Sequence, residues 1–405
     1  MTNSLWTTLK HLAVVQTGVT LSGEGDPSLP EWPYLRVANV QVGFVDLTEV
    51  KTLRLAEDAA ASFTLKRGDV LMTEGGDIDK LGRGAIWHGE IANALHQNHV
   101  FAVRPGARLL PEFLVYWLDG PVARNYFRLT AKKTTNLAAT NKWTLGNLPV
   151  ACPPIEDQRR IVAYLDQQTA EIDTLIEEQQ RLIDLLRERR ESATRSVLLR
   201  GLDSGVPVRH SGSDLLGQIP SAWRLVPTRY LCTITTGGED SGNASIDGKY
   251  PFYVRGREIL RSDDYAFDGE AVMTPGDGQG GTGKVFHYFS GKFQAHQRVY
   301  VFTDFHGIDG RYFYYYLSTF LQPIALAGSN TVTMESLRRP LLAAFPVAVP
   351  PLEEQRKIVK YLDQQASKTD TLITEVRRFI ELARERRAAL ITAAVTGQID
   401  VREAA

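Results

Sequence analysis

The chain has 405 residues, with 46 lysines and arginines against 47 aspartates and glutamates, so its formal net charge is −1 at pH 7. This length predicts two or three domains, and a balanced charge by itself argues against a nucleic-acid partner. No apolar run is long enough to cross a bilayer and no basic-then-apolar signal opens the sequence, so we expect a soluble, cytoplasmic protein without a membrane partner.

The first predicted domain, residues 1–152, has an α+β pattern. Short β-branched runs at 34–40, 69–72 and 99–103 favour strands, and a helix is predicted to begin at Pro111. Residues 120–155 contain no acidic side chain, whereas five basic ones fall there: Arg124, Arg128, Lys132, Lys133 and Lys142. A helix from Pro121 would place the first three on one face, which fits either a nucleic-acid surface or an ordinary solvated face.

The possible metal ligands lack a recognisable arrangement. Asp77, Asp79 and Lys80 could form a nuclease-like acid cluster, but the second domain matches it only with Asp277, so a solvated loop is the preferred interpretation. Four further residues lack the spacing of a metal site and are predicted to be structural or buried: His96, His99, Cys152 and Cys232. The sequence therefore predicts no metal and no other cofactor.

A long helix is predicted over residues 153–201, and the segment 350–405 repeats it before a C-terminal tail. Both begin with Pro-Pro-x-x-x-Gln-Arg-x-Ile-Val-x-Tyr-Leu-Asp-Gln-Gln, and both carry Arg-Glu-Arg-Arg near the end, at 187–190 and 384–387. Such a repeat indicates a duplicated unit. The prolines suit a first helical turn, and the glycines that follow each helix suit a left-handed terminal residue.

Apolar residues recur in each helix at alternating steps of three and four, which predicts a coiled-coil seam. The predicted seam residues are Ile161, Leu165, Ile172, Leu175, Leu182, Leu186 and Ala193, and then Ile358, Leu362, Leu372, Val376, Phe379, Ala383 and Leu390. A helix of about 45 residues is roughly 65 to 70 Å long, so its stripe needs an equally long partner. The only matching stripe is the other copy, and a duplicated unit that closes on itself would pair the two helices antiparallel.

Residues 202–349 are predicted to form a second α+β domain after a linker that reaches Gly217. The two domains resemble each other faintly, because 68–73 recurs at 269–274 and His96-Gln97 recurs as His296-Gln297. We expect a shared fold with divergent surfaces. The repeated helices then serve one common task, and the domains serve two different ones.

The glycine-rich run 276–284 fits two nucleotide-binding patterns, GxGxxG and GxxxxGK. Both need a helix after the loop, whereas residues 285–289 read as a strand, and Val285 stands where a P-loop needs Ser or Thr. A flexible loop that approaches a phosphate or a base edge fits better. There is also no Asn-Pro-Pro-aromatic methyltransferase motif and no nucleophile elbow, so we expect no catalytic site.

The two domains, each followed by a Pro-Pro-x-x-x-Gln-x-x-Ile-x-x-Tyr-Leu-Asp helix, resemble the specificity subunit of Type I restriction-modification systems. The resemblance covers the whole chain and is most specific in the two helices and at 217–223. It implies a non-catalytic chain in which two similar α/β target recognition domains read the halves of a bipartite, asymmetric double-stranded DNA site. The antiparallel helices would set the spacer. Two methyltransferase (M) subunits would dock and methylate adenine, and restriction/motor (R) subunits would join for cleavage.

The candidates for base contacts are side chains that suit the major groove, where Asn and Gln suit adenine and Arg and Lys suit guanine. The candidates in the first domain are Arg36, Asn39, Lys80, Arg83, Gln97, Asn98, Lys132, Lys133, Thr135 and Asn136. Those in the second domain are Arg255, Arg257, Gln279, Thr282, Lys284, Gln297, Arg298, Ser329, Asn330 and Thr331. Each could equally be an ordinary surface residue.

Three alternatives stay open from the sequence. The chain could serve a related system with a fused methyltransferase-nuclease. It could be a coiled-coil scaffold whose domains bind proteins. The least favoured alternative is a nucleotide hydrolase that uses 278–284.

Overall fold

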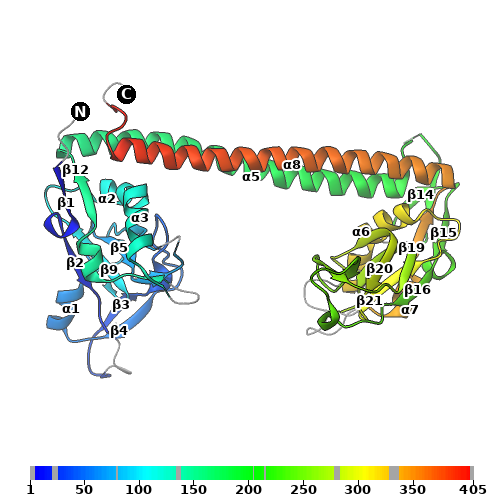
Figure 1. The fold of residues 1–405 in the computed structure, drawn as a ribbon, viewed down its shortest axis with the longest axis horizontal. Helices are drawn as coiled ribbons and strands as arrows, with labels where there is room; N and C mark the ends of the chain where they lie inside the picture. The colour runs from blue at the N-terminus through cyan, green and yellow to red at the C-terminus, as the bar shows by residue number, and fades with distance from the viewer. Residues whose placement is uncertain are drawn as a thin grey trace. The chain divides into compact units, whose positions relative to one another are not determined.

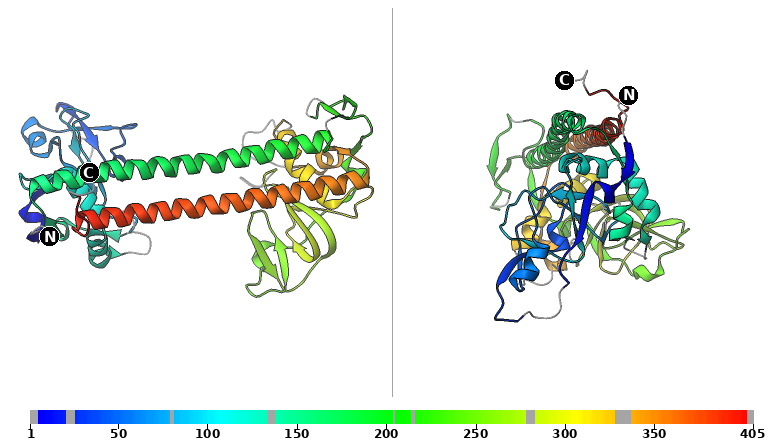
Figure 2. Two further views of the ribbon diagram at one scale, coloured as in Figure 1. Left: turned by 90° about the horizontal axis from the view of Figure 1, so that it is seen from above. Right: turned by 90° about the vertical axis from the view of Figure 1, so that its left-hand side faces the viewer.

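The computed structural model describes residues 5–20, 26–78, 81–133, 138–203, 205–213, 216–277, 283–327 and 337–401. It divides into two compact units, unit 1 with residues 1–179 and 377–405 and unit 2 with residues 180–376. Two long helices, α5 (Ile155–Arg200) and α8 (Leu352–Val395), lie side by side, and each contributes one part to each unit (Figures 1 and 2). The two predicted long helices are thus confirmed.

Unit 1 contains a mixed α+β domain. Its other helices are α1 (Glu57–Phe63), α2 (Pro111–Asp119), α3 (Pro121–Thr130) and α4 (Lys142–Gly146), with the 3-10 turns η1 (Leu9–His11) and η2 (Val37–Asn39). Its strands are β1 (Leu5–Thr8), β2 (Ala13–Thr17), β3 (Glu31–Leu35), β4 (Lys51–Arg54), β5 (Val70–Thr73), β6 (Gly75–Gly76), β7 (Gly84–Ile86), β8 (Leu95–His96), β9 (Val100–Pro105), β10 (Lys132–Lys133), β11 (Ala138–Ala139) and β12 (Pro149–Cys152).

Unit 2 contains a domain of the same kind. Its other helices are α6 (Gly310–Ala327) and α7 (Arg339–Ala344), with the 3-10 turns η3 (Thr228–Tyr230) and η4 (Ser241–Asn243). Its strands are β13 (Val208–His210), β14 (Gln218–Pro220), β15 (Arg224–Pro227), β16 (Thr233–Thr236), β17 (Tyr250–Tyr253), β18 (Ile259–Ser262), β19 (Phe267–Pro275), β20 (His287–Ala295), β21 (Val299–Thr303) and β22 (Pro346–Val349). The predicted linker up to Gly217 therefore includes one strand, β13, which pairs with β14.

The two domains share one strand order. The main sheet of unit 2 runs β16-β21-β19-β20-β17-β18. Unit 1 repeats this order in two pieces, β2-β9-β5-β7 and β8-β3-β4, because the two short strands β7 and β8 take the place of the long β20. In both units a strand near the start of the domain pairs with the strand that precedes the long helix, β1 with β12 and β15 with β22. The predicted internal repeat is thus confirmed at the level of topology.

In each unit one helix of the domain packs between the sheet and the long helices. Pro111 begins α2, and the apolar face of α2, with Phe113 and Trp117, enters one core with Leu165 of α5 and Ile391 of α8. In unit 2 the equivalent helix α6 shares a core with Leu198 of α5 and with Ile358 and Leu362 of α8. The domain and the coiled coil therefore fold as one body within each unit.

The long helices are antiparallel in both units. In unit 1 the Arg387 guanidinium bonds Asp173 at 2.9 Å, and in unit 2 Arg190 bonds Asp370 at 2.7 Å. The two ion pairs join the same positions of the repeat, and each pairs the end of one copy with the middle of the other. Together with the shared cores, this fixes opposite helix directions within each unit.

The predicted seam is correct at the ends of the helices and wrong by one residue in the middle. Leu182, Leu372 and Phe379 are 39%, 46% and 44% exposed, whereas the residues that follow them are buried: Ile183, Ile373 and Ile380. In α5 Thr169 is also buried, and its hydroxyl bonds the Leu165 carbonyl and lies 3.3 Å from the Tyr116 hydroxyl of α2. Among the described residues, no helix has the length and apolar character needed to cross a membrane.

Candidate nucleic-acid interface

Three loops of unit 2 meet where strands of its sheet end. Arg255 follows β17, Asp277 follows β19, and Arg298 follows β20. The Asp277 carboxylate lies 2.6 Å from Nη1 of Arg298 and 3.8 Å from Nη1 of Arg255. The arginine side chains are about half exposed (56% and 49%), whereas that of Asp277 is 25% exposed. The arrangement presents two guanidinium groups on one carboxylate.

The equivalent loops of unit 1 carry different residues. Leu35 pairs with His96 and Tyr253 pairs with Ala295, so Arg36 matches Val254 by strand register, and Arg255 lies one residue further along the equivalent loop. The Arg36 guanidinium pairs with Glu49 at 3.2 Å. His99 stands where unit 2 has Arg298, because its carbonyl accepts from the Glu74 amide as the Arg298 carbonyl accepts from the Gly276 amide, and the His99 ring lies 2.6 Å from the Glu74 carboxylate. One backbone arrangement therefore presents two different sets of polar side chains.

A buried histidine fixes the turn behind each of these loops. Nδ1 of His96 lies 2.8 Å from the Val100 carbonyl oxygen, so this nitrogen donates, whereas Nδ1 of His296 accepts from the Arg298 amide at 3.0 Å. The neutral rings are therefore opposite tautomers. Burial lowers the pKa of both histidines from the ordinary value of 6.5. The prediction that they are structural agrees with these contacts.

Asn39, a candidate for a base contact, is not available for that role. Its side chain is 3% exposed, its Oδ1 accepts from the Arg36 amide at 2.8 Å, and its Nδ2 donates to the Asp46 and Glu49 carbonyls. Asn39 therefore fixes the loop that carries Arg36. A polar side chain in the sequence suits this structural role and a base contact equally, so only the structure separates the two.

The other candidates divide by their contacts. Gln97 accepts from the Val37 amide at 3.3 Å, and Gln297 donates to Asp240 at 3.4 Å. Arg83 pairs with Asp119 at 3.1 Å. Side chains on exposed positions are Lys132, Lys133, Arg257 and Lys284. Eight candidates lie outside the described residues: Lys80, Thr135, Asn136, Gln279, Thr282, Ser329, Asn330 and Thr331.

The basic helix predicted from Pro121 is shorter than expected. α3 ends at Thr130, so Lys132 lies on β10 and does not share a helix face with Arg124 and Arg128. β10 pairs with β11, and β11 pairs with β6 at Gly75–Gly76, so these four residues lie in one small sheet. The acid-free segment therefore presents Lys132 and Lys133 on a strand, whereas Lys142 begins α4.

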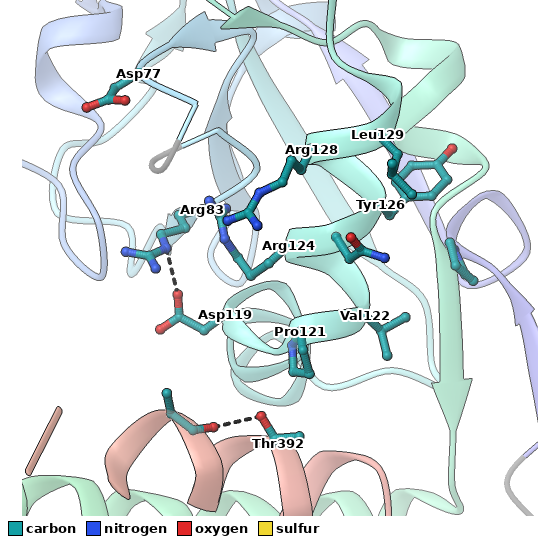
Figure 3. Close-up of a pocket in the computed structure, with 13 residues that line it drawn as sticks. Asp77, Arg83, Asp119, Pro121, Val122, Arg124, Tyr126, Arg128, Leu129 and Thr392 are labelled. Atoms are coloured by element: carbon teal, nitrogen blue, oxygen red, sulfur yellow. Dashed lines mark hydrogen bonds and ion pairs between the residues drawn. The ribbon is translucent and has the colours of Figure 1, made fainter. Parts of the chain in front are cut away.

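A cavity of about 1110 Å³ in unit 1 lies between α3 and the C-terminal part of α8 (Figure 3). Arg83, Arg124 and Arg128 line it, with Asp119 and Thr392 nearby. Arg83 is held by Asp119, and Arg124 donates to the backbone carbonyls of Leu81 and Ile78. Arg83 thus ties its loop to the end of α2 and Arg124 ties α3 to Ile78 and Leu81, which makes this cavity a weaker candidate than the strand-end loops.

The nucleophilic and metal-binding options are weak in the described part of the chain. Cys152 and Cys232 are free thiols, and burial raises the pKa of Cys232 to about 12, which disfavours a reactive thiolate. The described residues contain no group of three His, Cys, Asp or Glu side chains that could hold a metal ion.

Sequence reasoning missed Asp277 and Glu49 as partners of the arginines. A signal for Asp277 was available, because Gly76-Asp77, a few residues after β5, recurs as Gly276-Asp277 after β19. Glu49 lies in the β3–β4 connection, residues 36–50, whose counterpart in unit 2 is only residues 254–258, so only the tertiary contact reveals it.

Comparisons with known proteins agree with this architecture. Residues 220–382 match the Type I restriction modification DNA specificity domain. A Methanocaldococcus jannaschii protein described as a candidate type I restriction enzyme MjaX specificity subunit is 22% identical over 409 residues, which cover 96% of this chain and 92% of that protein. The type I restriction enzyme EcoDI specificity subunit of Escherichia coli is 27% identical over 183 residues, 45% of this chain and 40% of that protein.

Two solved structures have a similar fold. A chain from a study of complex assembly and conformational transition in the type I R-M system has a TM-score of 0.73 and 19% identity, covering 96% of this chain and 97% of that one. The HsdS subunit from Thermoanaerobacter tengcongensis has a TM-score of 0.54 and 19% identity, covering 98% of this chain and 97% of that one. The resemblance inferred from the repeated helices is thereby confirmed.

Proposed function

We propose that this chain, a type I restriction-modification specificity subunit by its domain match and its similarity to such subunits, reads one half of a bipartite, asymmetric DNA site with each of its domains. The observation that carries the proposal is the duplicated sheet. Matching strand ends present Arg36, Gln97 and Asn98 in unit 1 and Arg255, Gln297 and Arg298 in unit 2. Two domains with the same backbone arrangement but different polar side chains suit two different half-sites on one duplex.

The antiparallel helices would fix the gap between the half-sites and offer a docking surface to two methyltransferase subunits. The chain itself would perform no catalysis and bind no cofactor. The partners would supply adenine methylation, and restriction subunits would supply cleavage. The duplication supports this division, because a pseudo-twofold chain offers an equivalent surface to each of two identical partners.

The net charge of −1 bears on affinity. Phosphate contacts supply most non-specific binding, so we expect the isolated chain to bind DNA weakly and to gain affinity with its partners. Replacing the exposed Lys132 and Lys133 with alanine should weaken binding to all duplexes alike. Nanomolar, salt-insensitive binding by the chain alone would contradict this expectation.

The deciding experiment is methylation mapping. The chain is expressed with the methyltransferase subunits of its host in cells that lack other adenine methylation, and methylated adenines are located in genomic DNA. One bipartite motif with a constant gap is expected. Methylation at a continuous motif, or none above the level without the chain, would overturn the proposal.

A further inference from the structure

We infer that Asp277 is a positioning residue that holds Arg255 and Arg298 of unit 2 for the recognition of a guanine, so that Asp277 controls base specificity in the half-site read by this unit. The inference rests on the proposed function. It adds a base class, a location in the fold and a residue that makes no base contact of its own.

The geometry assigns different roles to the carboxylate and the guanidinium groups. Asp277 Oδ2 lies 2.6 Å from Arg298 Nη1, a short charge-assisted contact, while Oδ1 is buried and faces Arg255 at 3.8 Å. An oxygen that is shielded from solvent cannot itself meet a base edge. The half-exposed arginines can, because each guanidinium carries five N–H donors and the contacts to Asp277 engage only Nη1.

The backbone that carries Arg298 is fixed as well. The Arg298 amide donates to the buried His296 ring at 3.0 Å, and the Arg298 carbonyl accepts from the Gly276 amide at 2.8 Å. The loop of Asp277 and the loop of Arg298 are therefore tied together through both backbone and side chain. A guanidinium held at its base and at one nitrogen loses little freedom when it binds.

Guanine is the base that this arrangement favours. Its O6 and N7 are both acceptors on the major-groove edge, and a planar guanidinium bonds both at once. A carboxylate beside two arginines opposes phosphate binding, since it removes positive charge where the polyanion would approach. Asp277 therefore lowers the affinity for DNA of any sequence. It also orients the two guanidinium groups, which favours discrimination between bases.

Unit 1 provides an internal contrast. Arg36, one residue short of the position of Arg255, pairs with Glu49 of its own β3–β4 connection, and His99, at the position of Arg298, pairs with Glu74. The described strand-end loops of unit 1 therefore do not bring two arginines onto one carboxylate. A change at Asp277 should affect one half of the site and leave the other half unchanged.

The test compares the complete complex with methyltransferase subunits carrying the unmodified chain, Asp277→Asn, Arg298→Ala, or the control Asp268→Asn. Asp268 is an exposed residue of β19 in the same unit, so its removal changes the net charge equally. Binding is measured with duplexes carrying the mapped motif, and with duplexes in which each G·C pair of either half is replaced, one at a time, by A·T.

For the unmodified chain and Asp268→Asn, we expect one G·C pair whose replacement weakens binding by at least about tenfold. The measured ratio is the affinity for the mapped motif divided by the affinity for the duplex with that pair replaced. For Asp277→Asn this ratio should fall several-fold, while affinity for random DNA stays equal or rises. Arg298→Ala should lose discrimination at the same pair. Asp277→Glu, which retains the charge, should restore part of the ratio.

Three results would overturn the inference. The first is an unchanged ratio for Asp277→Asn, and the second is equal weakening on all duplexes, which indicates a merely structural role. The third is a change in both halves of the motif. Failure of the proposed function is distinguishable, because then the complex with the unmodified chain would yield no bipartite motif, and this inference would fall with it.

Discussion

The backbone of Gly18 in unit 1 and of Gly237 in unit 2 passes against the turn that carries the buried histidine. A Cβ atom on Gly18 would lie 1.9 Å from the His96 carbonyl oxygen, and one on Gly237 would lie 1.9 Å from the Ala295 carbonyl oxygen. Neither glycine has a positive φ, so the requirement is space and not backbone conformation. These contacts set the distance between the first strand of each sheet and its candidate base-reading loop.

Gly237→Ala should therefore destabilise unit 2 by about 2 to 3 kcal/mol, because the neighbouring atoms are backbone and cannot move aside cheaply. Gly238→Ala is the matched control, since a Cβ there meets nothing within 4 Å. The two variants are compared by urea unfolding. Equal stability of the two would contradict the close approach.

His96 predicts a pH dependence of stability. Burial lowers its pKa from 6.5, so below about pH 6.5 the unfolded chain binds a proton that the folded chain resists. Stability that is present above pH 6.5 is then lost as the pH falls toward the lowered pKa. His96→Asn, which keeps a donor for the Val100 carbonyl, should flatten the decline in unfolding temperature between pH 7 and pH 5. The exposed His88→Asn is the control and should leave the decline unchanged.

At the scale of the elements, the polar identities of the two long helices are explained by their contacts with the domains. Gln158 is fully buried: its Oε1 accepts from the Leu110 amide at the start of α2, and its Nε2 donates to the Arg108 and Pro153 carbonyls. Gln355 makes the equivalent contacts with Asp309, Gly307 and Pro350. A seam needs only apolar residues, so these glutamines are kept because they fasten each helix to its domain.

Gln158→Ala should lower the stability of unit 1 by about 2 to 3 kcal/mol, because it leaves buried backbone groups without partners. Gln167→Ala changes an exposed glutamine of the same helix and should cost less than about 0.5 kcal/mol. Denaturant unfolding of the full chain measures both. If both changes lower the unfolding free energy by a similarly small amount, the buried Gln158 amide does not hold α5 to its domain.

The domain helices add a second fastening. The Tyr116 hydroxyl donates to Asp166 at 2.7 Å, and the Tyr315 hydroxyl donates to Asp363 at 2.5 Å. In unit 2 Arg311 also bonds Asp363 and lies over the rings of Tyr288, Tyr314 and Tyr315. These contacts explain why the Tyr-Leu-Asp part of the repeat has an unchanged aspartate, and they orient each sheet on its own part of the coiled coil.

At the scale of the whole molecule, the proposed spacer role predicts a length effect. Seven residues inserted after Gln179 in α5 and seven after Val376 in α8 preserve the seam and lengthen both helices by about 10 Å, or about three base pairs of DNA. The methylated motif should keep both half-sequences and gain about three base pairs in its gap. Insertion into α5 alone, which leaves the helices unmatched, should abolish methylation. An unchanged gap with both insertions would contradict the spacer role.

The sequence by itself determined the two long helices, their antiparallel pairing, the internal repeat and the family resemblance. These follow from periodicity and from identity at polar positions such as Gln158 and Gln355, which a single chain displays along its length. It also placed Arg255 and Arg298 among the candidates, because their residue types suit base edges.

Only the tertiary structure decided which polar residues are available. Asn39 and Arg298 look alike in a sequence, yet one is buried on backbone carbonyls and the other is half exposed on Asp277. Glu49 lies 13 residues from Arg36 and Asp277 lies 21 residues from Arg298, and the seam shifts by one residue at Ile183, Ile373 and Ile380. Burial and pairing depend on contacts between distant segments, so neither composition nor local period can determine them.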